Sequence, residues 1–117
     1  MIPGRKFQTD GIESDISIDA GKVELEGTLG IPKETSAIVL FAHGSGSSRH
    51  SPRNRYVAQV LQSQAIGTLL FDLLTREEES IDEFSEELRF DIPFLATRLM
   101  DATRWLMQRP DRLSFVE

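Results

Sequence analysis

Cysteine is absent from the 117 residues of this chain, which excludes a disulfide framework, a cysteine-ligated zinc site and a thiol nucleophile. Long apolar runs are also missing, since no stretch approaches the ~20 residues that a membrane-spanning helix needs. Arg5 and Lys6 near the N-terminus are not followed by an apolar segment, so we expect no secretory signal and a cytoplasmic location.

Positive charge is scarce, because 13 lysines and arginines stand against 19 acidic residues and give a formal net charge of −6. Eight of the acids and two of the bases lie in residues 76–91, and the rest of the chain is balanced. Nucleic-acid phosphates require a basic face, so we expect no nucleic-acid partner. The acidic segment lacks the D-x-D-x-D-G order of a calcium loop, and we interpret it as a solvated loop or helix face.

The rest of the composition is typical of a globular chain. Hydrophobic residues make up 39% of it, and its length fits one domain by the usual prior of ~100–200 residues. Residues 14–19 and 22–29 each alternate polar and apolar side chains, and Ala20 and Gly21 lie between them. This pattern predicts an antiparallel hairpin with one solvent-exposed face and a turn at Ala20 and Gly21.

Two apolar runs show no alternation. They cover residues 37–42 and 67–71, and such runs are typical of strands that helices cover on both faces of a sheet. A helix is expected after the first run, with Ser51 as its N-cap and Pro52 as its first residue. We expect its buried face to carry four residues at helical spacing, namely Tyr56, Val57, Val60 and Leu61.

A second helix is expected near the end of the chain. Pro93 lies near its start, Arg109 in its last turn and Pro110 at its end, and residues 113–117 could begin a further buried strand. Alternating buried strands and amphipathic helices predict an α/β fold, with an antiparallel hairpin followed by parallel strands and crossover helices. The predicted buried stripe of this helix is Leu95, Leu99, Ala102 and Leu106.

The strongest signal for chemistry lies in residues 43–55, HGSGSSRHSPRNR, which we call the Gly-Ser-Arg segment. It connects a predicted strand to a predicted helix, where open α/β sheets bind ligands. Its glycines allow a tight turn with outward N–H groups, and the helix N-terminus adds a positive dipole end. The segment predicts an anion or oxyanion site, although a plain turn with solubilising arginines has the same spacing. The candidate ligand-binding residues are His43, Gly44, Arg49 and Arg53.

Other combinations of polar residues are weaker. Ser47, His50 and Asp72 could touch as a local triad, but nothing in the sequence fixes the geometry that defines one. We interpret Asp72 as a turn residue and His50 as a solvated or anion-site residue. The two histidines lack the i,i+4 spacing of a helical metal site and have no clustered carboxylate nearby, so we expect no metal and no cofactor.

Three segments together resemble a known superfamily. Residues 38–44, IVLFAHG, resemble the first parallel strand and His-Gly turn of α/β-hydrolases. The Gly-Ser-Arg segment, residues 70–75 (LFDLLT) and residues 89–93 (RFDIP) are similar to the dienelactone-hydrolase-like branch. The resemblance covers roughly residues 15–110. It implies a partial α/β-hydrolase sheet, with residues 1–117 as one incomplete domain that stops before the nucleophile elbow.

The resemblance further implies a carboxylic ester or lactone hydrolase that uses serine, an acid and histidine. In that fold one oxyanion donor follows this strand, and the matching residues are Ser45 and Gly46, which would act through their backbone N–H groups. The sequence contains no G-x-S-x-G nucleophile pattern, and the acid and histidine that follow it in chain order are absent too. We therefore expect the N-terminal portion of a serine hydrolase, without turnover by itself.

A second function stays open at this point. A non-catalytic module could use the Gly-Ser-Arg segment to bind a small anion or a protein. The expected partners are a small ester or anion, with no nucleic acid and no membrane. Because the strand that neighbours residues 38–42 in the family's order is missing or incomplete, we also expect a homodimer through an open sheet edge.

Overall fold

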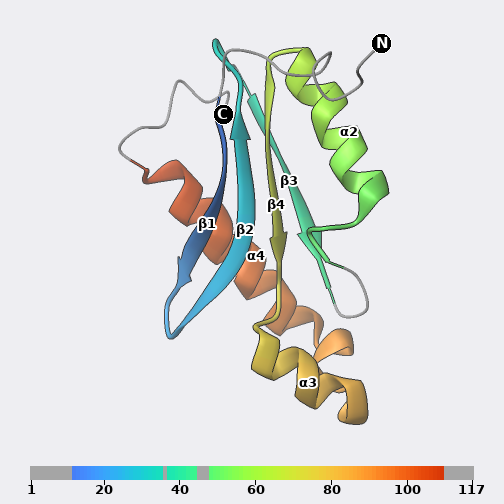
Figure 1. Ribbon diagram of the computed structural model, residues 1–117. Coiled ribbons are helices and arrows are strands. Elements are labelled where there is room, and N and C mark those ends of the chain that lie inside the picture. Colours follow the sequence, from blue (N-terminus) through green and yellow to red (C-terminus); the bar gives the residue numbers. More distant parts are fainter. Residues whose placement is uncertain (1–11, 36, 45–47, 110–117) are drawn as a thin grey trace.

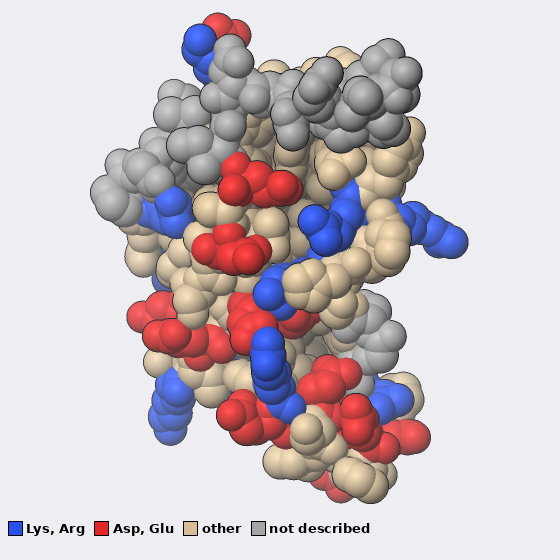
Figure 2. Space-filling view, in the orientation of Figure 1, with Lys and Arg blue, Asp and Glu red and all other residues tan. Residues whose placement is uncertain are grey.

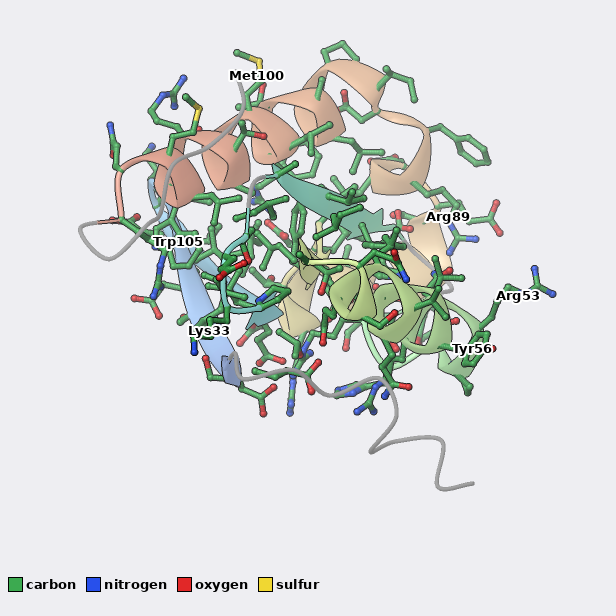
Figure 3. The ribbon with its side chains drawn as sticks, turned by 90° about the horizontal axis from the view of Figure 1, so that it is seen from above. Lys33, Arg53, Tyr56, Arg89, Met100 and Trp105 are labelled. Atoms are coloured by element: carbon green, nitrogen blue, oxygen red, sulfur yellow. The ribbon has the colours of Figure 1, made fainter. Side chains whose placement is uncertain are left out.

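The computed structural model describes residues 12–35, 37–44 and 48–109 of the chain. They form one four-stranded sheet in the order β1-β2-β4-β3, with helices on both faces (Figures 1 and 3). The strands are β1 (Ile12–Ala20), β2 (Val23–Ile31), β3 (Ala37–His43) and β4 (Ile66–Asp72). The helices are α2 (Pro52–Ser63), α3 (Arg76–Ser85), the 3-10 turn η1 (Leu88–Phe90) and α4 (Ile92–Met107).

β1 and β2 form the expected antiparallel hairpin, in which Ile18 pairs with Leu25. Both of these side chains are fully buried, while the alternate residues of β1 are exposed, so the hairpin has the one wet face that its alternation predicts. The turn lies one residue later than expected, at Gly21 and Lys22. Gly21 has a φ of +83°, which glycine adopts without the steric penalty of a Cβ.

β4 lies at the centre of the sheet, parallel to β3 and antiparallel to β2. Its residues 67–71 are all buried, as the second apolar run predicts. The same prediction is wrong for β3, in which Val39 is 38% exposed and Ala42 is also exposed. The reason is position: within the described part of the chain β3 pairs with β4 alone and forms an edge of the sheet.

α2 packs on one face of β4 through Ala58, which is 2% exposed. Ser51 precedes the helix as predicted, but its side chain makes no capping hydrogen bond. The predicted buried face is only partly right, because Tyr56 and Val57 are exposed and only Val60 and Leu61 are half-buried. The main contact of α2 among the described elements is with β4, and a small alanine lets the helix approach that strand closely.

α4 packs on the opposite face, over a core cluster that includes Leu69 and Phe71 of β4 (Figure 3). The Asp91 carboxylate caps its start by accepting a hydrogen bond from the Phe94 N–H at 3.2 Å. In the predicted stripe Leu95 is partly buried and Ala102 and Leu106 are buried, whereas Leu99 is 40% exposed and Arg98 takes its place. Pro110 and residues 113–117 lie outside the described residues.

Of the two interpretations of the acidic segment, a loop or a helix face, the helix face is right for most of it. It forms α3, η1 and the cap of α4, and it lies below the end of β4 in Figure 1. Asp82 of α3 is fully buried, where its carboxylate accepts hydrogen bonds from the N–H groups of Leu88 and Arg89 and from the Arg89 guanidinium. Most of the other acids are exposed or half-buried, so the expected solvated face is right for those and wrong for Asp82.

The architecture is therefore mixed α/β, with an antiparallel hairpin joined to a parallel pair, as the sequence predicts. Among the described helices, none is both long and apolar enough to cross a membrane.

Candidate functional site

A pocket of about 900 Å³ opens at the carboxyl end of β4, next to the loop that leads from β3 into α2. Ligands of open α/β sheets bind at this edge. In Figure 2 acidic side chains gather on the lower half of the molecule, over the end of the hairpin and over α3. The pocket is lined by Val23, Glu24 and Glu26 of the hairpin, Ser48, Arg49 and His50 of the loop, Asp72 of β4, and Leu74, Thr75, Arg76, Glu77, Glu78 and Glu79 around the start of α3.

His43 ends β3 and is only 4% exposed. Its Nδ1 lies 3.2 Å from the Phe71 carbonyl oxygen, which can only accept, so Nδ1 carries the proton. The Asn54 side-chain amide then donates to Nε2, 3.0 Å away. Both ring nitrogens are occupied within the protein, so His43 ties the ends of β3 and β4 to the start of α2.

Arg49 is held by two carboxylates. Its backbone N–H donates to Oδ1 of Asp72 at 2.9 Å, and its Nη1 lies 3.1 Å from both Asp72 Oδ2 and Glu26 Oε1. Its side chain is 12% exposed. Glu26 also pairs with Arg76 at the start of α3, 3.5 Å away. The two arginines that line the pocket are therefore both paired with carboxylates of the same pocket.

Asp72 does more than form a turn, because it links the end of β4 to the loop through Arg49. The weak triad hypothesis receives no support from the residues that can be placed. Asp72 is engaged by Arg49, only the backbone N–H of the exposed His50 is seen to bond, to Ser48 Oγ, and Ser47 lies outside the described residues.

The remaining predicted site residues divide into two groups. Ser45 and Gly46, the predicted oxyanion donors, lie outside the described residues. Gly44 is half-buried at the end of β3, and a Cβ built there would meet nothing within 4 Å. Arg53 is exposed on α2 and extends away from the rest of the molecule in Figure 3.

The start of α3 forms one wall of the pocket and is fixed by a capping box. Thr75 Oγ1 accepts from the Glu78 N–H at 3.2 Å, and Glu78 Oε1 accepts from the Thr75 N–H at 2.9 Å. Arg98 of α4 donates to both carboxylate oxygens of Glu78 and to the Leu73 carbonyl. The hydrogen bonds from Arg98 hold the pKa of Glu78 below its ordinary value, and burial opposes the shift.

Sequence reasoning missed four of these residues. The T-x-x-E spacing of Thr75 and Glu78 is a recognisable capping-box signal. Arg98 stands out as a cation in register with the apolar residues Ala102 and Leu106. Glu26 carries no signal, because it is one of several acids that alternate along the wet face of a hairpin. No cluster of three or more potential metal ligands occurs among the residues that the structure describes.

The dienelactone hydrolase from Anabaena variabilis has a similar structure. The similarity covers 86% of this chain and 47% of that chain, at 58% sequence identity and a TM-score of 0.82. A second structure, m3DLH, matches 90% of this chain and 47% of its own with a TM-score of 0.60, and at 16% identity it supports the fold alone. The described residues therefore have a partial α/β-hydrolase-like fold, similar to part of a dienelactone hydrolase.

Curated relatives carry a different name. Two proteins of Mycobacterium tuberculosis, from strains CDC 1551 and H37Rv, are each described as a putative phosphoribosyl transferase. Each is 51% identical over 102 residues, which is 87% of this chain and 22% of the relative. The chain thus spans about a fifth of these relatives and about half of the dienelactone hydrolase. No family model matches the chain.

Proposed function

We propose that this chain is the N-terminal portion of a serine-type α/β-hydrolase that acts on carboxylic esters or lactones. In this proposal the loop after β3 supplies half of the oxyanion hole, through the backbone N–H groups of Ser45 and Gly46. The nucleophile, the acid and the histidine are not among its 117 residues, so the chain alone has no turnover.

The observation that carries the proposal is the 58% identity to a dienelactone hydrolase over 86% of the chain, together with a pocket at the carboxyl end of β4. An oxyanion donor contributes about 10²–10³ in rate, and only when a nucleophile is present. The proposed donors, Ser45 and Gly46, lie outside the described residues, so the support for an acyl-transfer site comes from the sequence identity and the fold.

The name of the curated relatives favours a different chemistry, because a phosphoribosyl transferase handles phosphate groups. The pocket fits that chemistry poorly, since both of its arginines are paired with carboxylates and the start of α3 adds further acids. The matched residues make up only 22% of those relatives. We therefore propose that the hydrolase-like fold belongs to the matched 22% of these relatives. The name phosphoribosyl transferase describes the whole relatives and is not transferred to this chain.

The first test uses the chain as it is. We expect no hydrolysis of p-nitrophenyl esters and no labelling of any serine by a fluorophosphonate probe. Saturable labelling of one serine, or turnover above the uncatalysed rate, would overturn the expected inactivity of the chain alone.

The second test supplies the missing groups. The chain is fused to the part of the Anabaena variabilis dienelactone hydrolase that it does not match, and lactone and ester hydrolysis are measured. We expect activity in the fusion and a loss of about 10²–10³ in kcat when Ser45→Pro removes one backbone donor. Ser45→Ala keeps that N–H and should lose far less. A folded fusion without activity would contradict the proposed oxyanion role.

A further inference from the structure

Arg49 differs from the other arginines of the Gly-Ser-Arg segment in its surroundings. Arg53 and Arg55 are exposed on α2, whereas the side chain of Arg49 is 12% exposed and contacts two strands. We propose that Arg49 is a positioning residue, which fixes residues 48–50 against β2 and the end of β4 instead of offering a free cation to a ligand. The importance of Arg49 for catalysis rests on the proposed function, whereas its contacts are observed in the structure.

Three hydrogen bonds attach Arg49 to the sheet. Asp72 at the end of β4 accepts from both the backbone N–H and the guanidinium of Arg49, and Glu26 of β2 accepts from the same Nη1. Hydrogen bonds between a guanidinium and a carboxylate are roughly twice as strong as neutral ones. Arg49 therefore holds the loop through its backbone and its side chain at once.

The charges around Arg49 alternate. Arg76 pairs with Glu26, Glu26 with Arg49, and Arg49 with Asp72, so a chain of ion pairs runs from the start of α3 to the end of β4. Each cation in this chain has a carboxylate within 3.5 Å. An anion entering the pocket would have to displace one of these carboxylates or lie beside it, which Coulomb repulsion disfavours.

The ion pairs of Arg49 lie between two walls of the pocket. Ser48, Arg49 and His50 form one wall of the pocket, and the start of α3 forms another. Glu26 contacts an arginine from each wall, so this network links the two walls. In a hydrolase, loosening it would move the loop that follows β3 away from the reacting atoms, and small displacements of this kind reduce rates strongly.

The test measures backbone amide hydrogen exchange residue by residue in the 117-residue chain. The variants are Arg49→Gln, Arg49→Lys and Asp72→Asn, and Arg53→Gln is the matched control from the same segment. We expect Arg49→Gln and Asp72→Asn each to raise exchange of the Arg49 and His50 amides about tenfold, with amides of the hairpin unchanged. Arg49→Lys should restore part of the protection, and Arg53→Gln should change nothing.

A double variant and a titration decide between positioning and anion binding. If Arg49 acts through Asp72, the double variant Arg49→Gln with Asp72→Asn should exchange no faster than either single variant. Inorganic phosphate should leave the exchange of these amides unchanged. Saturable protection by phosphate that Arg49→Gln abolishes would overturn the proposal, and so would a uniform rise in exchange across the sheet. An inactive hydrolase fusion with normal local protection would contradict the proposed function alone.

Discussion

β3 and β4 are neighbouring strands of similar composition with different environments. Both are strands of seven residues built around an apolar run, and they pair in parallel along their whole length. β4 lies between two strands and has five consecutive buried residues, whereas β3 forms an edge in the described part of the sheet and exposes Val39 and Ala42. The comparison shows that apolar composition reports the tendency to form a buried strand, while neighbours decide how much of that strand is buried.

The largest expected effect of a substitution is in the centre of β4. Phe71→Ala removes a fully buried ring from the core cluster, and we expect it to lower the free energy of unfolding by about 3–5 kcal/mol. Val39→Ala in β3 should cost about 1 kcal/mol or less, because the side chain is 38% exposed. Urea denaturation of both variants measures the difference, and equal losses would show that β3 is covered in solution.

The Glu78–Arg98 pair anchors the segment after β4. Breaking this pair should give the second-largest decrease in the free energy of unfolding. Glu78→Gln leaves Arg98 nearly buried without its anionic partner, and we expect a loss of about 2–3 kcal/mol in urea denaturation. Asp101→Asn is the control, since Asp101 pairs with the exposed Arg104 and its loss should change stability little. Similar losses in the two variants would contradict the anchoring role of the Glu78–Arg98 pair.

The same pair predicts a dependence of stability on pH. Arg98 lowers the pKa of Glu78 in the folded state, so its stabilisation is complete above the unfolded pKa, near the ordinary value of 4.5. The stabilisation is lost as the pH falls below 4.5 toward the lower folded pKa. Thermal unfolding across this range should show a smaller decrease for Glu78→Gln than for the unmodified chain. Parallel curves would contradict the assignment.

The contact between the two strands gives a further prediction. A Cβ at Gly67 of β4 would lie 2.9 Å from Ile38 of β3 and 3.2 Å from the Gly30 carbonyl oxygen. We therefore expect Gly67→Ala to cost about 1–3 kcal/mol in urea denaturation. Gly44→Ala is the control, because a Cβ there meets nothing within 4 Å. If both variants lose equal stability, the strands are not as closely packed as described.

The smallest expected effect on stability is at the edge itself. Val39→Lys should change the free energy of unfolding by less than about 1 kcal/mol, because a long side chain can carry its charge into solvent. The same charge should block edge-to-edge pairing. We expect the unmodified chain to form a dimer by light scattering and the variant to be a monomer. A monomeric unmodified chain would contradict the predicted homodimer.

Local patterns in the sequence were sufficient for most of the elements. Period-two alternation located the hairpin, and unbroken apolar runs located β3 and β4. Helical spacing and proline positions located α2 and α4 to within a few residues. These features depend on neighbours in sequence, which is why they can be read from it. Of the Gly-Ser-Arg segment, Ser48, Arg49 and His50 line the pocket at the carboxyl end of β4.

Only the tertiary structure decided which charged groups form ion pairs and which of the two parallel strands is buried. Arg49 meets Glu26 and Asp72 across 23 residues of sequence in each direction, and Arg98 meets Glu78 across 20. Such pairs form because separate elements converge on one edge of the sheet, and no local pattern encodes them. The sequence by itself determined that this is an α/β protein with apolar strands and a glycine-rich loop. The burial of β3, the neutralised charge of Arg49 and the buried Asp82 follow from packing in three dimensions.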